Sequence, residues 1–153
     1  MGEVVWYSDD DIVIKFDKVP DVDIRIIEPT MTDEEIKAIY KKPFICKSEL
    51  KVIIIDKDEP MQYDFTIPKG YCWDGASIPK SVWFLIGSKT EPKFLIPSLI
   101  HDVLCENHDY IDDDRYLSTI VLERLCRVSR VLGINRWAIK HSVDNFQKVF
   151  GGW

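Results

Sequence analysis

The feature that most constrains the fold is a change in the spacing of apolar residues along the chain. In the first two-thirds, apolar and polar side chains alternate, as in Asp21–Ile27 and Tyr63–Ile67, which indicates strands with one buried face. In the last third, apolar residues recur every three or four positions, the spacing of amphipathic helices. The pattern predicts an α+β fold, in which a small antiparallel sheet packs against a C-terminal bundle of about four helices.

The individual elements follow from local signals. Strands are expected at Val4–Tyr7, Ile12–Phe16, Asp21–Ile27, Lys51–Ile55 and Tyr63–Ile67. One helix interrupts them, because Thr32 and Glu35 can form a capping box, and it should end before Pro43. The later helices are expected at Lys80–Ile86, at Lys93–Glu106, from the residue after Asp112–Asp114 to Leu132, and at Asn135–Val149. A chain of 153 residues with no linker reads as a single domain, 1–153.

Charge and cysteine content narrow the class of protein. The net charge of −6 divides into −11 for residues 1–114 and +5 for residues 115–153. The basic tail carries seven cations but no docking motif, so nucleic-acid binding through these helices is only a weaker alternative. No apolar run reaches the length of a membrane span. The four cysteines form no C-x-x-C pair, which favours reduced thiols over a zinc knuckle.

The first candidate site is the run from Asp74 to Pro79, where the sheet gives way to helix. Glycines on both sides of Tyr71–Asp74 permit a tight turn, and Pro79 suits a first helical turn. In a structural interpretation, Asp74 holds the corner and Ser77 caps the next helix. In a functional interpretation, Asp74 is a carboxylate on a rigid turn, available to a metal ion or a substrate proton.

The second candidate is the pair His101 and Asp102, which lies inside an otherwise apolar helix. If buried, such a pair needs polar partners. It is either a structural pair or, together with Asp74, a metal site or acid–base group, with Asp74 and His101 as the candidate metal ligands. Arg124 falls within the apolar stripe of a later helix, so we predict that it pairs with Asp102 or Asp74. Asp74, Ser77, His101, Asp102 and Arg124 would then form one structural polar network.

Two of these motifs carry a family resemblance. The runs Phe65–Tyr71 and Trp73–Lys80, then Trp83, then Leu99–Leu104, resemble a phage and prophage family catalogued as domain of unknown function 1353. The resemblance covers about Phe44 to Phe150, which makes residues 44–150 a family-like core and residues 1–43 an N-terminal extension with one helix. Cys105 stands where that family has a tyrosine. The family's Ala-Asp pair has no clear match near Ser118, which weakens a metal-centre interpretation.

The resemblance implies a phage-encoded accessory protein, without assigning it a molecular activity. We therefore expect a virion, tail or assembly protein of the host cytoplasm or the virion, which acts by binding a protein partner. The alternative is a metal-dependent hydrolase that uses Asp74, His101 and Asp102. The binding protein is expected to need no cofactor. The hydrolase would use a divalent metal ion.

Overall fold

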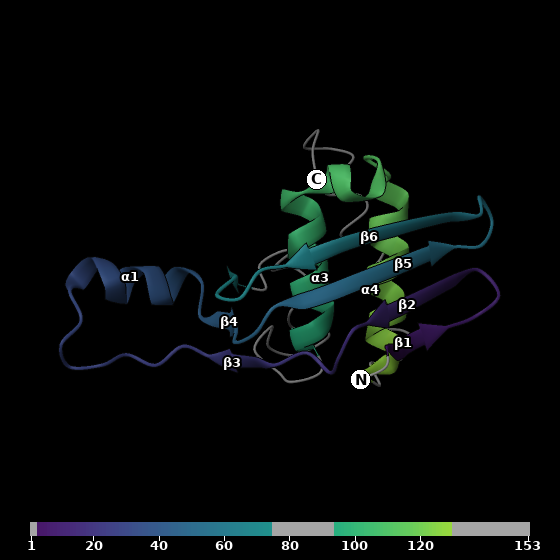
Figure 1. Cartoon of the computed structure of the whole chain (residues 1–153). Helices are drawn as coiled ribbons and strands as arrows, with labels where there is room; N and C mark the ends of the chain where they lie inside the picture. Colours follow the sequence, from purple (N-terminus) through teal and green to yellow (C-terminus); the bar gives the residue numbers. More distant parts are fainter. Residues whose placement is uncertain (1–2, 75–93, 130–153) are drawn as a thin grey trace.

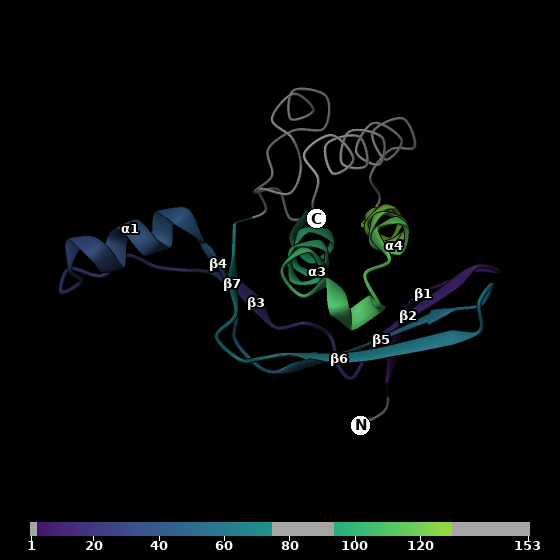
Figure 2. The same cartoon turned by 90° about the horizontal axis from the view of Figure 1, so that it is seen from above.

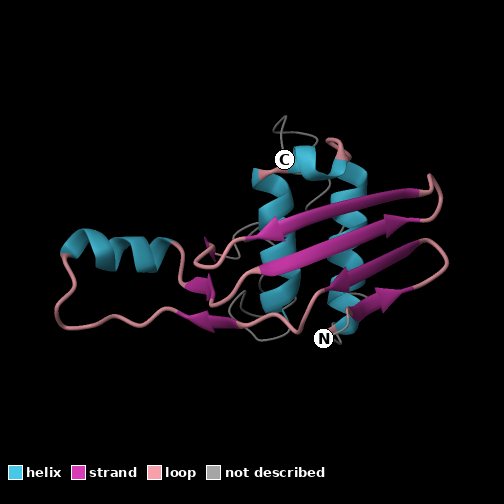
Figure 3. Cartoon of the chain, viewed as in Figure 1, coloured by secondary structure: helices cyan, strands magenta, loops and turns pink. Residues whose placement is uncertain are grey.

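The computed structural model describes residues 3–74 and 94–129, and it confirms the α+β class (Figure 1; Figure 3). The strands are β1 (Val4–Ser8), β2 (Ile12–Phe16), β3 (Val22–Ile24), β4 (Phe44–Cys46), β5 (Leu50–Asp56), β6 (Met61–Ile67) and β7 (Cys72–Trp73). The helices are α1 (Asp33–Lys41), α3 (Leu95–Glu106), the short 3-10 helix η2 (His108–Ile111) and α4 (Arg115–Val128). No helix in the described ranges is long and apolar enough to cross a membrane.

The larger sheet has the strand order β1-β2-β5-β6, and every neighbouring pair is antiparallel. Alternate residues of β2, β5 and β6 are buried, among them Ile12, Ile14 and Phe16 of β2. Figure 2 shows α3 and α4 lying side by side across one face of this sheet. The core therefore sits between the sheet and these two helices, where the strand alternation and the helical stripe meet.

The smaller sheet has the order β3-β4-β7, and α1 lies beyond it, away from α3 and α4 (Figures 1 and 2). We call residues 22–41, which contain β3 and α1, the arm. Thr32 Oγ1 accepts a hydrogen bond from Glu35 N at 3.2 Å, so the expected N-cap of α1 is present. The guanidinium of Arg25 donates to the carbonyl of Lys42 at 3.1 Å, which ties the extended part of the arm to the end of α1.

Several boundaries differ from the sequence prediction. β4 and β7 were not expected, and β3 is shorter than the strand predicted at Asp21–Ile27. α4 ends at Val128, before the predicted Leu132. Its start is as predicted, because Asp114 caps the helix by accepting a hydrogen bond from Leu117 N at 3.0 Å. Where about four C-terminal helices were expected, the described residues show three: α3, η2 and α4. The helices expected at 80–86 and 135–149 lie outside the described residues.

Candidate functional site

The strand before Asp74 is joined directly to the helix that carries His101. Trp73, which ends β7, donates a hydrogen bond from its indole Nε1 to Ser98 Oγ on α3 at 3.0 Å. Both side chains are buried, and Ser98 Oγ also donates to the carbonyl of Leu95 at 3.2 Å. Asp74 follows Trp73 and is half-buried. Trp73 and Ser98 therefore link the smaller sheet to α3, whereas Ser77, the other residue predicted at this corner, lies outside the described residues.

His101 is almost entirely buried, with 1 % of its surface exposed. Its Nε2 lies 3.5 Å from Cys105 Sγ, whereas its Nδ1 has no hydrogen-bond partner in the described part of the chain. Burial lowers the pKa of His101 to about 4, because a charged imidazolium would lose its hydration there. The ring is therefore neutral at pH 7.

Two further groups on this side of α3, the thiol of Cys105 and the hydroxyl of Tyr71, are also held in their neutral forms. Burial and the nearby Asp102 and Glu106 raise the pKa of the Cys105 thiol to about 12, so Cys105 is not a ready nucleophile. The pKa of Tyr71 is raised by burial and by the same two carboxylates. Asp102 itself is 6 % exposed. This side of α3 is a buried polar region rather than a set of activated groups.

The described residues do not assemble a metal centre. Within 3–74 and 94–129, no group of three or more His, Cys, Asp or Glu side chains is placed to hold a metal ion. Asp74, His101 and Asp102, all of which are described, therefore do not come together as a three-ligand set.

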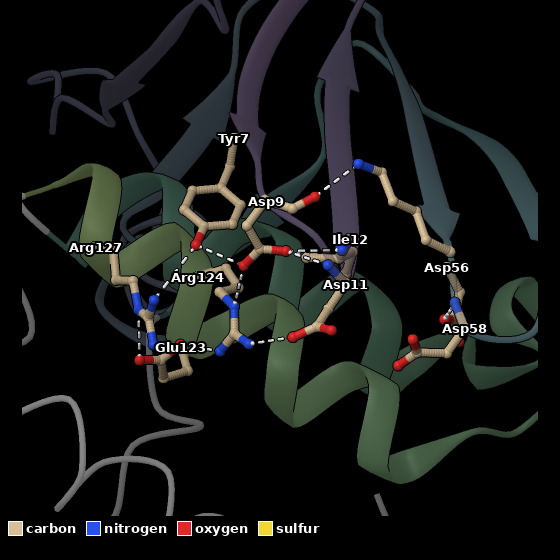
Figure 4. Close-up of polar contacts among 10 residues, drawn as sticks. Tyr7, Asp9, Asp11, Ile12, Asp56, Asp58, Glu123, Arg124 and Arg127 are labelled. Carbon is tan, nitrogen blue, oxygen red and sulfur yellow. Dashed lines mark hydrogen bonds and ion pairs between the residues drawn. The ribbon is translucent and has the colours of Figure 1, made fainter.

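Arg124 does pair with acids, but not with those predicted. Its Nε donates to Asp9 Oδ2 at 2.9 Å, its Nη2 lies 3.6 Å from Asp11 Oδ2, and its Nη1 donates to Glu123 (Figure 4). The physical reason is that this face of α4 packs against β1 and the turn after it. The ion-pair partners of Arg124 are thus Asp9, Asp11 and Glu123 in place of the predicted Asp102 or Asp74.

This network closes into a ring of five side chains (Figure 4). Tyr7 donates from its hydroxyl to Asp9 Oδ2 at 2.7 Å, and Arg127 links Glu123 Oε1 at 2.9 Å back to the Tyr7 hydroxyl at 3.4 Å. Partial burial favours the protonated form of Asp9. Hydrogen bonds from Tyr7, from two backbone amides and from Arg124 outweigh burial and hold its pKa well below the usual range. The ring fixes the turn between β1 and β2 on α4.

Beside this ring lies a pocket of about 150 Å³, which we call the acidic pocket. It is lined by Asp11, Ile12, Asp56, Asp58, Asp114, Tyr116, Leu117, Ile120 and Arg124. The floor is apolar, since Ile12 and Leu117 are 1 % and 5 % exposed. The rim comes from three places in the sequence: the turn between β1 and β2, the end of β5 with the turn after it, and the start of α4.

The sequence reasoning missed both the ring and the pocket. Asp9 and Asp11 resemble ordinary turn residues, and only the predicted need of Arg124 for an acid pointed toward them. Among the cations proposed for nucleic-acid binding, Arg124 and Arg127 are engaged with Glu123. Arg130, Arg136, Lys140 and Lys148 lie outside the described residues.

Comparison with known proteins gives a family and one short match. A family model described as "Protein of unknown function (DUF1353)" matches residues 49–143. The chain is also 43 % identical over 49 residues to an "Uncharacterized protein y4jT" of Sinorhizobium fredii (strain NBRC 101917 / NGR234). That match covers 32 % of this chain and 15 % of the relative, so the chain spans a small part of the relative's length. No solved structure matches this chain.

Proposed function

The chain belongs to the DUF1353 family, and we propose that it acts by binding a protein partner whose Lys or Arg side chain enters the acidic pocket. One observation carries the proposal: four aspartates surround an apolar floor in a pocket the size of a single side chain. A long basic side chain has the matching chemistry, with an apolar stem and a charged head.

Size favours a side chain over a whole small molecule. Pockets for drug-sized ligands usually span about 300–1,000 Å³, and the acidic pocket has about 150 Å³. Ile12, Leu117 and Ile120 offer apolar contact to methylene groups. The remainder of a partner would then lie across the surface outside the pocket.

Charge favours a cation. Among the described residues that line the pocket, Arg124 is the one basic side chain, and its charge is already engaged by Asp9, by Glu123 and by Asp11 of the rim, which leaves Asp56, Asp58 and Asp114 without a pairing to it. The rim therefore remains negative. Burial raises the pKa of Tyr63, and the charges of neighbouring carboxylates raise it further, with the strongest effects from Asp112, Asp114 and Asp56. Such a field attracts basic groups from solution.

An organic cation fits the rim better than a metal ion does. The four aspartates lie in the described part of the chain, where no group of acids is placed to hold a metal ion. A guanidinium or ammonium group donates several hydrogen bonds over a wider area, so it suits carboxylates that do not converge on one point.

We place this binding role in a phage particle or its assembly pathway, with the host cytoplasm or the virion as its location. The motif resemblance to a phage and prophage family supports this placement, and the binding role itself needs no cofactor. Among the described residues, no observation favours the alternative of a metal-dependent hydrolase that uses Asp74, His101 and Asp102, so we do not carry it further.

The proposal is tested by NMR titration of the labelled protein. The probes are Nα-acetyl-arginine amide and Nα-acetyl-lysine amide, with Nα-acetyl-norleucine amide as the neutral control. We expect saturable shifts of the Ile12 and Leu117 amides with the two cations, weaker in Asp58→Asn and unchanged in Asp10→Asn, which removes an equal charge outside the pocket. Added salt should weaken binding. Equal shifts with the neutral probe, or equal binding by both variants, would overturn the proposal.

The phage placement has its own test. Purified particles and assembly intermediates of a phage that encodes the chain would be probed with an antibody against it. Absence of the chain from both would reject the placement, while leaving the binding of a basic side chain to be judged by the titration.

A further inference from the structure

We propose that the outer edge of β3 pairs antiparallel with β3 of a second copy of the chain, centred on Ile24. The two three-stranded sheets, each ordered β3-β4-β7, would then form one continuous six-stranded sheet. The inference rests on three features of the arm: the direction of its backbone groups, the order of its charges and the exposure of its aliphatic side chains.

The backbone decides which residues can pair. Odd-numbered residues bond toward β4, since Arg25 N donates to the carbonyl of Pro43 at 2.7 Å and Lys47 N donates to the carbonyl of Asp21 at 2.8 Å. In an antiparallel ladder, the residues between them direct N–H and C=O to the other side. Val22, Ile24 and Ile26 therefore face outward, and within the described residues no strand pairs with this edge.

The charges then select one register. Residues whose backbone groups point outward must lie opposite residues of the same kind in the second copy. In a symmetric pair, the residue that lies opposite its own counterpart is therefore residue 23, 24 or 25. If residue 23 is the centre, Asp23 lies opposite Asp23 of the second copy. If residue 25 is the centre, Arg25 lies opposite Arg25 of the second copy. A centre at Ile24 places Asp23 opposite Arg25 of the second copy, twice. Opposite charges across strands stabilise a pair, and like charges destabilise it.

The same register joins the exposed aliphatic side chains. Ile24 is 56 % exposed and Ile26 is 75 % exposed, although both are apolar. Centring on Ile24 places it beside its own counterpart, and it places the partly buried Val22 beside the exposed Ile26 of the second copy, on the same face. Contiguous exposed apolar groups of this kind mark interaction surfaces.

The single copy partly shields this edge. Asp23 Oδ1 accepts a hydrogen bond from Ile24 N at 2.8 Å, and Asp23 Oδ2 lies 3.7 Å from Lys47 Nζ. On pairing, Ile24 N–H would donate to the carbonyl of Ile24 in the second copy, and the Asp23 carboxylate would turn to Arg25. The guanidinium of Arg25 has five N–H donors, so it can keep its bond to the carbonyl of Lys42.

Sedimentation of the full chain over a concentration series tests the pairing. We expect a dimer that weakens about tenfold or more in Asp23→Arg and in Arg25→Asp, because each variant opposes like charges. A mixture of these two variants restores opposite charges and should form a heterodimer. The double exchange, with Asp23→Arg and Arg25→Asp in one chain, should dimerise again.

The rescue separates pairing from damage to the arm, since a misfolded variant would not regain association when mixed. Circular dichroism of each variant checks that the fold is kept. A wild-type chain that stays monomeric up to about 1 mM would overturn the proposal. So would single variants that dimerise as well as the wild type, or a mixture that fails to associate.

Discussion

Acidification should destabilise this protein well before its carboxylates titrate, and His101 should be the cause. His101 is buried, and its Nδ1 has no partner in the described part of the chain. Burial lowers its pKa from an ordinary 6.5 to about 4. In the unfolded chain the same ring is hydrated and takes up a proton near pH 6.5.

The sign and size of the effect follow from this difference. Between pH 6.5 and 4, the unfolded state binds a proton that the folded state does not, so the free energy of unfolding falls as the pH falls. At about 1.4 kcal/mol for each pH unit between the two pKa values, the full loss is about 3 kcal/mol. It is complete once the pH passes below the folded pKa, and above pH 7 the group has no effect on the pH dependence.

The measurement is urea unfolding at intervals of about half a pH unit from 7.5 to 4, for the wild type and for His101→Gln. The chain's other two histidines stay in both proteins, so the difference between the curves isolates His101. We expect the wild type to lose stability between pH 6.5 and 4.5 where the variant does not. Parallel curves would refute the reasoning, and would mean that His101 is protonated in the fold or paired with an acid.

Three further predictions concern the links that hold α4 and α3 in place. Arg124→Met should lower the free energy of unfolding by about 2–4 kcal/mol, because Glu123 is largely buried beside it; if the urea midpoint is unchanged, the ring adds no stability. The double variant with Asp9→Asn should cost less than the sum of the two single changes, since the carboxylate of Asp9 is then no longer left without Arg124, while Glu123 keeps its bond to Arg127 in both cases. Ser98→Ala should cost about 1–3 kcal/mol by leaving the buried indole N–H of Trp73 without its acceptor. A cost for Ser98→Ala no larger than that of a surface substitution would contradict this reading of the contact.

The parts of the fold that local chemistry decides were predictable from the sequence. α1 begins after Thr32, as its capping signal indicates, and β2 has the predicted bounds because alternation leaves one register for its buried face. β4 and β7 escaped prediction because three and two residues are too few to show a period. They exist through tertiary pairing: Phe44 lies opposite Trp73, and their rings pack 5.5 Å apart.

The candidate site shows the same division. The position of Arg124 on an apolar stripe indicates that it needs an acid, but the sequence does not say which one. The acid is Asp9, 115 residues earlier in the chain, and only the packing of α4 on β1 brings the two together. The acidic pocket draws its aspartates from three separate segments for the same reason. The identity of the family was readable from its motifs, because those are local in sequence.

The strand order shows how the segment matched by the family model depends on the residues before it. The family model begins at residue 49, yet β5 pairs with β2 and β7 pairs with β4, and both of these partners precede that residue. The matched segment is thus smaller than the set of strands that build the two sheets of this chain. Cut at residue 49, β5 would become an unprotected edge carrying Val52 and Ile54, the kind of edge that recruits foreign strands. In this chain, the strands that cover these two edges, β2 and β4, come from the segment before residue 49.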